Sequence, residues 1–365
     1  MSQNPPETKL KRTPRLWVIF LSIFLVLLMG ASAGAWWAWN TYQTMLSPVG
    51  GTDEEFLVTV PRGASSRQIG QILAEQGLVH DARVFRLYLR YFELDGKIQA
   101  GTYYLSPILS LAEIVDKLVA GQVYRETIRF TVPEGMFILG IADRLAQRGI
   151  VDKERFLELI QDREHWHDFW FIQEIPANAE WLLEGYLFPD TYEIAADAED
   201  REERVIRVML RRFEQLFTQE MRERAEELGF SVHEIVTLSS IVEKEAVVDK
   251  ERPVIAGVFH NRLAQRMMLQ SCATVNYILK DFSIRTLTTA QLNINNPYNT
   301  YRNTGLPPGP IAAPGIRSLM ATLWPEETNY LFFVAKDDGS SQHYFARTYA
   351  EHRSNIAKAA RNRRK

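Results

Sequence analysis

The chain is nearly devoid of cysteine, and one long stretch near its N-terminus carries no charge. Cys272 is the single cysteine among 365 residues, so an intramolecular disulfide is excluded and cysteine content does not indicate a cellular compartment. No charged residue occurs from Leu16 to Thr52. The first part of this stretch, 16–39, would form a helix of about 36 Å, which exceeds the ~30 Å core of a bilayer.

Basic residues precede the apolar stretch, and tryptophans stand near both of its ends. This arrangement predicts a transmembrane helix with the N-terminus in the cytoplasm and the rest of the chain outside it. A cleaved signal peptide is the alternative, because Ala31-Ser-Ala33 has the composition of a cleavage site.

Three familiar catalytic motifs are also missing. His233-Glu-Ile-Val-Thr237 begins like a zinc-protease helix, but threonine stands where the second histidine ligand is needed. Ser240 and Lys244 lie four residues apart, whereas penicillin-binding enzymes need a spacing of three. No glycine-rich phosphate loop is present. We therefore expect no metal site and no cofactor.

The net charge of −3 is unevenly distributed, since both ends of the chain are basic and the body between them is acidic. An acidic body argues against nucleic acid as a partner. The basic C-terminus is expected to be a solvated tail.

A weak internal repeat with a constant offset occupies the segment after the apolar stretch. Thr59-Val-Pro-Arg-Gly63 and Leu73-Ala-Glu-Gln-Gly77 recur as Thr131-Val-Pro-Glu-Gly135 and Leu145-Ala-Gln-Arg-Gly149. Each copy predicts a strand, a turn, a helix and a glycine cap, followed by a second helix. Such modules resemble carbohydrate-binding LysM folds, although simple structural packing produces the same pattern. Further along, one long charged helix is expected over about 199–229.

The most informative residue is a glutamate on an apolar helix. Leu238, Ile241 and Val242 precede Glu245 by seven, four and three residues, so all four share one helical face. Burial on such a face raises a carboxyl pKa toward the range where it can donate a proton near neutrality. Glu243 projects about 200° away and is not expected to act on the same bond.

Ordered motifs around this helix resemble those of the endolytic murein transglycosylases of the MltG type. They are Ser240-Ile-Val-Glu-Lys-Glu245, Glu251-Arg252, Val258-Phe-His-Asn-Arg-Leu263, Leu269-Gln-Ser271, Pro297-Tyr-Asn-Thr-Tyr301, Gly305-Leu-Pro-Pro-Gly-Pro-Ile311 and Pro314-Gly315, with Glu184-Gly-Tyr-Leu-Phe-Pro-Asp190 and Ala100-Gly-Thr-Tyr-Tyr104 further upstream. One departure is Cys272-Ala273, where many members of the family have Asp-Pro, so a role for an acid at that position is in doubt.

The resemblance implies an α+β protein with an N-terminal transmembrane helix, LysM-like modules and a C-terminal α+β catalytic domain. The expected ranges are a cytoplasmic basic tail at 1–15, the transmembrane helix at 16–39, a linker at 40–53, LysM-like modules at 54–161, the catalytic domain at 162–352 and a basic tail at 353–365.

The implied reaction is non-hydrolytic cleavage of the β-1,4 bond between N-acetylmuramic acid and N-acetylglucosamine, which leaves 1,6-anhydro ends. Glu245 takes the position of the family's catalytic acid. Glu184, Gln270 and Asn299 are hypothesised to position the substrate, and loop-structure roles are equally open for each. Peptidoglycan strands, the membrane and glycan synthases are the expected partners. A non-catalytic scaffold that binds the cell wall and a hydrolytic muramidase are the alternatives.

Overall fold

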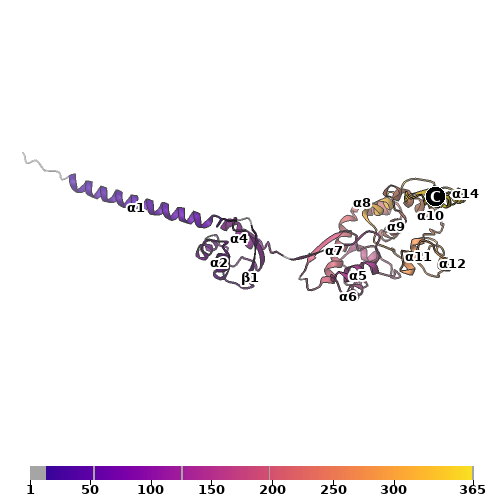
Figure 1. The fold of residues 1–365 in the computed structure, drawn as a ribbon, viewed down its shortest axis with the longest axis horizontal. Helices are drawn as coiled ribbons and strands as arrows, with labels where there is room; N and C mark the ends of the chain where they lie inside the picture. Colours follow the sequence, from indigo (N-terminus) through magenta and orange to yellow (C-terminus); the bar gives the residue numbers. More distant parts are fainter. Residues whose placement is uncertain (1–13, 52–53, 125, 197, 364–365) are drawn as a thin grey trace, which may run out of the picture. The chain divides into compact units, whose positions relative to one another are not determined.

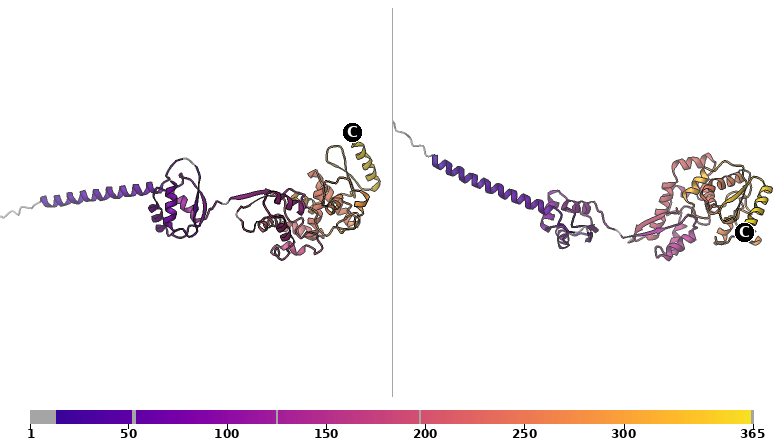
Figure 2. Two further views of the ribbon diagram at one scale, coloured as in Figure 1. Left: turned by 60° about the horizontal axis from the view of Figure 1, so that its bottom comes forward. Right: turned by 45° about the horizontal axis from the view of Figure 1, so that its top comes forward.

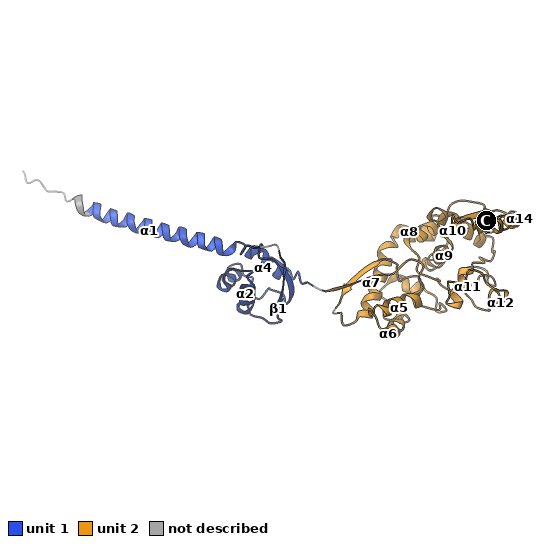
Figure 3. Cartoon of the chain, viewed as in Figure 1, with its two compact units in different colours: residues 1–125 blue, residues 126–365 orange. Residues whose placement is uncertain are grey.

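The computed structural model describes residues 14–51, 54–124, 126–196 and 198–363. The chain divides into two compact units, residues 1–125 and residues 126–365 (Figure 3). Of the predicted basic tail at 1–15, all but the last two residues lie outside the described residues. The predicted mixed α+β class is confirmed by helices and antiparallel strand pairs in both units.

The first unit begins with one long helix, α1 (Pro14–Leu46), which is uninterrupted in Figure 1. Its segment Trp17–Leu46 has the length and apolar composition to cross a membrane, and it is the single candidate among the described residues. The helix continues past the predicted end at residue 39 because no charge, proline or capping signal interrupts it there. An N-terminal signal sequence has the same character, so both predicted alternatives remain open.

The first copy of the repeat folds into a small module after α1. Its elements are β1 (Phe56–Val60), α2 (Ser66–Glu75), α3 (Ala82–Tyr91), β2 (Gly101–Leu105) and α4 (Leu111–Val119). The two strands pair antiparallel, with Phe56 opposite Leu105. Capping boxes at Ser65 and Ser110 start α2 and α4. The apolar faces of the three helices enclose one core with the strand pair.

The second copy of the repeat belongs to the second unit. Its elements are β3 (Thr127–Thr131), α5 (Ile138–Gln147) and α6 (Lys153–Ile160). β3 pairs with β4 (Thr191–Ala195), and one core encloses residues from both. The compact units therefore divide at 125/126, whereas the predicted domains divide at 161/162. The strand pairing explains the difference, because β3 obtains its partner from beyond α5 and α6 rather than from the first copy.

The predicted single helix over 199–229 is wrong in one respect, since two helices occupy it. α7 (Arg201–Leu216) and α8 (Gln219–Glu227) are separated by a break at Phe217. Thr218 caps α8 by accepting a hydrogen bond from the backbone N–H of Met221. Both helices bury residues at their apolar positions, so the charged face was correctly identified and the internal cap was missed.

The second unit has further helices and one more strand pair, several of which contribute to the surroundings of Glu245. They are the 3-10 turns η1 (Trp170–Glu174) and η2 (Asp249–Glu251), the helices α9 (Val232–Glu245), α10 (Arg252–Ala264), α11 (Cys272–Leu279), α12 (Thr289–Leu292), α13 (Ile316–Leu323) and α14 (Tyr349–Asn362), and the strand pair β5 (Phe332–Ala335) and β6 (His343–Ala346).

The C-terminal range predicted as a basic tail, 353–365, is mostly helix α14. Both views in Figure 2 show this helix, in yellow, along the surface of the second unit. It packs on β5 and β6, and it buries Asn355 and Ala359. The range differs from a solvated tail because apolar residues at helical spacing accompany its charges.

Replacing Thr218 by alanine should lower the free energy of unfolding of the second unit by about 1 kcal/mol, because the α8 cap is lost. Urea denaturation of the full chain in detergent, followed by tryptophan fluorescence, measures this change. Thr286→Ala is the matched control, since Thr286 is exposed and caps no helix. An equal effect of both substitutions would contradict the assigned cap.

Candidate active site

Helix α9 positions Glu245 as its last helical residue. Ser231 accepts a hydrogen bond from the N–H of Glu234, and the Glu234 carboxylate accepts one from the N–H of Ser231, so the start of the helix is fixed. Leu238, Ile241 and Val242 are fully buried, as the shared face predicts. The backbone leaves the helix at Ala246, so the carboxylate lies beside the negative end of the helix dipole.

The Glu245 carboxylate lines a pocket of about 400 Å³, within the range of ligand sites. Residues from five segments surround it: Phe259 and Arg262 of α10, Leu269 to Cys272 at the start of α11, Tyr301 of the following loop, Phe333 to Ala335 with His343 from the strand pair, and His352 with Ile356 of α14. Glu245 is the one carboxylate among the described residues of this lining.

Burial raises the pKa of Glu245, and several weaker effects oppose the rise. Ser271 Oγ donates a hydrogen bond to Glu245 Oε1 at 2.5 Å, and the Ala273 N–H donates another. The charge of Arg262, and that of His343 when its imidazole is protonated, also favours the carboxylate. Because desolvation outweighs these effects, the acid retains its proton to a higher pH than a solvated glutamate does. This is the state required of a proton donor.

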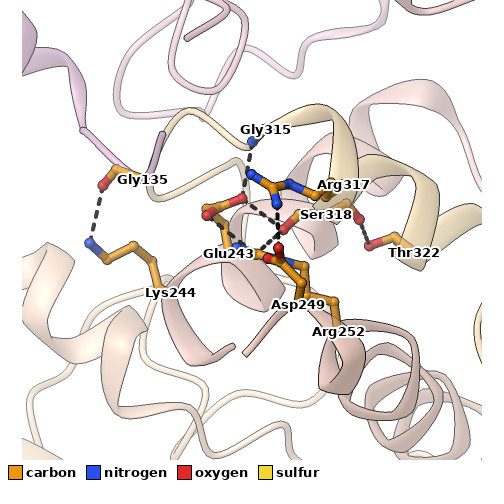
Figure 4. A network of polar contacts seen from close by, with 9 residues as sticks. All are labelled: Gly135, Glu243, Lys244, Asp249, Arg252, Gly315, Arg317, Ser318 and Thr322. Atoms are coloured by element: carbon orange, nitrogen blue, oxygen red, sulfur yellow. Dashed lines mark hydrogen bonds and ion pairs between the residues drawn. The ribbon is translucent and has the colours of Figure 1, made fainter. Parts of the chain in front are cut away.

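Glu243 points to the opposite side of α9, as its position two residues earlier predicts. It accepts hydrogen bonds from Ser318 Oγ at 2.7 Å and from the Gly315 N–H at 3.0 Å, and it pairs with Arg252 at 3.3 Å (Figure 4). Both charged side chains of this pair are less than a tenth exposed. Lys244 Nζ donates to the Gly135 carbonyl at 3.1 Å. These contacts anchor the end of the helix from behind while Glu245 faces the pocket.

Gln270 lies in the lining beside Glu245, as hypothesised for a substrate-positioning residue. It is exposed, and its φ of 49° places the backbone in the left-handed region. Its backbone N–H donates to the Thr300 carbonyl at 3.1 Å, so the strained conformation is held by the loop. Gln270 is thereby kept in the lining of the pocket.

Asn299 is fully buried, and its side chain is committed to the loop that carries Tyr301. Asn299 Nδ2 donates to the carbonyls of Leu292 and Ile294 at 3.0 and 2.8 Å, and Oδ1 accepts from the Tyr301 N–H at 3.0 Å. This geometry favours the loop-structure role over direct contact with a sugar.

Glu184 is also buried and lies outside the lining of the Glu245 pocket. Its carboxyl accepts from the Ile138 N–H at 3.2 Å, at the start of α5, and from Tyr277 Oη at 3.3 Å. Burial raises its pKa to about 8. Phe137, the N-cap residue of α5, makes no side-chain cap, so Glu184 caps that helix from another segment.

The sequence did not reveal three side chains that complete the pocket: Arg262, Tyr301 and His343. Arg262 and Tyr301 fall within motifs that carry the family resemblance, which was their only signal. No motif marked His343 as a functional residue. The segments that carry Glu245 and α10 lie far from His343 in the sequence, and they meet it only in the folded chain.

An acid of raised pKa that lines an open pocket of an α+β domain is the arrangement typical of an acid–base enzyme. The chain belongs to the YceG-like family, whose model matches residues 58–358. The predicted resemblance is thereby confirmed.

Two relatives carry the name endolytic murein transglycosylase. The Bacillus subtilis protein is 33% identical over 305 residues, which cover 81% of this chain and 82% of that protein. The Streptococcus pneumoniae D39 protein is 28% identical over 362 residues, and the match spans 93% of this chain and 64% of that longer protein. A crystal structure of a yceG-like protein from Listeria monocytogenes aligns with a TM-score of 0.56 and 34% identity, over 83% of this chain and 99% of that one.

The raised pKa of Glu184 makes the stability of the second unit depend on pH. Between pH 4.5 and about 8 the folded chain retains a proton that the unfolded chain releases, so stability falls as pH rises through this window. The fall should approach about 1.4 kcal/mol per pH unit. Urea denaturation at several pH values should show this slope in the wild type and a smaller slope in Glu184→Gln. Identical slopes would contradict a buried, protonated Glu184.

Proposed function

We propose that this chain is an endolytic lytic transglycosylase that cleaves the β-1,4 bond between N-acetylmuramic acid and N-acetylglucosamine in nascent peptidoglycan, and so limits glycan strand length. Membership of the family and the names of its relatives supply the substrate class. The observation that carries the proposal is that Glu245 is the one carboxylate lining the pocket and has a raised pKa.

In this reaction the protonated Glu245 donates to the glycosidic oxygen as the bond to C1 breaks. The C6 hydroxyl of the muramic acid residue attacks C1, and its proton returns to the Glu245 carboxylate. An internal nucleophile has a high effective molarity, so one acid performs work that a hydrolase divides between two. The products carry 1,6-anhydro ends.

A hydrolytic muramidase is less well supported by the pocket. Glycosidases place a second carboxylate ~5–5.5 Å or ~6.5–9.5 Å from the acid. Glu184 is engaged by Ile138 and Tyr277, and Asp190 pairs with Arg212 at 2.7 Å. Neither of these acids lines the pocket. A non-catalytic scaffold is disfavoured for a different reason, since a binding surface has no need of a desolvated acid.

We also propose that α1 anchors the protein in the cell membrane by a single span, with the N-terminus cytoplasmic and both folded units outside the cytoplasm. The length of the apolar helix and the basic residues before it support this topology. An anchored enzyme would meet glycan strands as they leave membrane synthases, which are the proposed partners.

We assign glycan binding to a LysM-like module in the first unit and catalysis to the range 162–352. The strand–helix–helix order of 56–91 supports the first assignment. Residues 126–161 were predicted as part of the LysM-like region, but they share a core with the catalytic range and contribute to its framework.

Glu245→Gln should abolish anhydro-ended products, because glutamine keeps the size of the side chain and cannot donate an acidic proton. We expect a loss of at least about 100-fold in rate on purified nascent glycan, measured by mass spectrometry of product ends. Glu180→Gln is the matched control, since Glu180 is outside the pocket and pairs with Lys280 at the surface. Products with reducing ends would favour the muramidase, and an inactive wild type would favour the scaffold.

The raised pKa of Glu245 also predicts how the rate depends on pH. Because the reaction starts from the protonated acid, the rate should persist above the ordinary glutamate range and fall as pH rises through the elevated pKa. Ser271→Ala removes a hydrogen bond that stabilises the carboxylate, so this alkaline limb should move to higher pH. A limb that moves to lower pH in Ser271→Ala would contradict the assignment of the limb to Glu245.

A further inference from the structure

His343 lines the same pocket and is paired with a buried carboxylate behind the lining, Glu251, and the mechanism above leaves this pair unused. His343 Nδ1 lies 2.8 Å from Glu251 Oε2, and the two side chains are 8% and 9% exposed. The His343 backbone N–H also donates to both Glu251 oxygens, at 3.2 and 3.1 Å. A buried carboxylate needs such partners, and these fix both the position and the tilt of the imidazole.

The pair engages Nδ1 of His343 with Glu251, so Nε2 is the ring nitrogen that remains available in this residue of the pocket lining. When Nδ1 donates its hydrogen to a carboxylate, neutral imidazole carries its lone pair on Nε2. The His343 ring lines the same pocket as Glu245, and Phe333 packs edge-on against it with 5.4 Å between ring centroids. The ring therefore has the environment of a proton acceptor.

The other titratable side chains of the lining are less suited to that role. Arg262 donates hydrogen bonds to the carbonyls of Leu331, Met268 and Leu269 and remains protonated in proteins. Cys272 Sγ and Tyr301 Oη lie 3.1 Å apart, and burial raises the pKa of both groups.

His352 completes this set, and its ring stacks on Phe332 with 5.1 Å between centroids. Burial lowers its pKa, and no carboxylate contact supports a protonated His352 in the described structure. His343 is distinguished from all of these side chains by the acid directly behind its ring.

We propose that His343, oriented by Glu251, accepts the proton of the C6 hydroxyl while Glu245 protonates the leaving oxygen. This inference rests on the proposed function and divides between two residues the proton transfers assigned above to Glu245 alone. His343 is then a catalytic residue and Glu251 a positioning residue.

The step balances without any co-reactant. The C1–O4 bond breaks and its electron pair remains on O4, which takes the Glu245 proton. The C6 oxygen forms the new bond to C1 and releases its proton to Nε2. The resulting imidazolium is paired with the Glu251 carboxylate, and transfer of its proton to the Glu245 carboxylate restores the starting state.

His343→Asn tests the proposal, because the asparagine amide can keep the donation to Glu251 and has no basic nitrogen. With the full chain in detergent and purified glycan strands, kcat should fall about 100-fold or more, while KM stays within about twofold. The residual products should keep anhydro ends.

Glu251→Gln provides a second measurement, since it preserves the size of the side chain and an acceptor for the backbone N–H. Its kcat should fall more than about tenfold because the imidazolium loses its counter-charge. His260→Gln is the matched control. His260 is a partly buried histidine outside the pocket, and the glutamine can keep its Nε2 contact with the Thr322 carbonyl, so kcat should not change.

Each outcome separates the inference from the proposed function. Wild-type kcat in His343→Asn, with Glu245→Gln inactive, would overturn the inference and leave the function in place. A loss confined to KM or to the unfolding temperature would also overturn it. If His343→Asn does not fold, an unchanged kcat in Glu251→Gln has the same meaning. A wild type that forms no anhydro ends would overturn the proposed function itself.

Discussion

Removal of water from one carboxyl group is the constraint on which the site depends. Glu245 lies at the end of a helix whose preceding turns are buried, and the pocket lining supplies no second carboxylate among the described residues. Its two hydrogen-bond donors and nearby positive charges only partly offset the cost of burial. Additional hydrogen-bond donors would stabilise the carboxylate and lower the pKa of Glu245, so the acid would lose the proton that the reaction needs. The contacts of Glu245 are therefore weak enough for burial to keep its pKa raised.

The two acids of the Glu-Lys-Glu segment illustrate how neighbouring residues acquire different roles. Glu243 is also buried, but Arg252, Ser318 and the Gly315 N–H satisfy it fully, so it serves to hold the helix end. Removing one partner of such a pair would leave an uncompensated charge and cost several kcal/mol. Because the two side chains project from different sides of α9, Glu243 contacts Arg252 and Ser318 while Glu245 lines the pocket.

Local pattern was sufficient to predict the helix of Glu245, the direction of Glu243 and both repeat copies, whereas the α+β class of the whole chain was implied by the family resemblance. Pairing between distant segments could not be read in this way. The partner of β3 lies beyond two helices, and Glu184 caps α5, from which one helix and a 3-10 turn separate it in the chain. The break at Phe217 depends on a single threonine cap within a continuous charged pattern. His343 gains its surroundings only when the last strand pair folds against η2.

The pocket wall includes His352 and Ile356 of α14, a helix that follows α9 at a long distance in the chain. During synthesis the ribosome therefore produces Glu245 well before these side chains. The wall of the pocket is complete only after α14 has been synthesised and has packed on β5 and β6, so the last turns of the described chain finish a site whose acid was made about a hundred residues earlier.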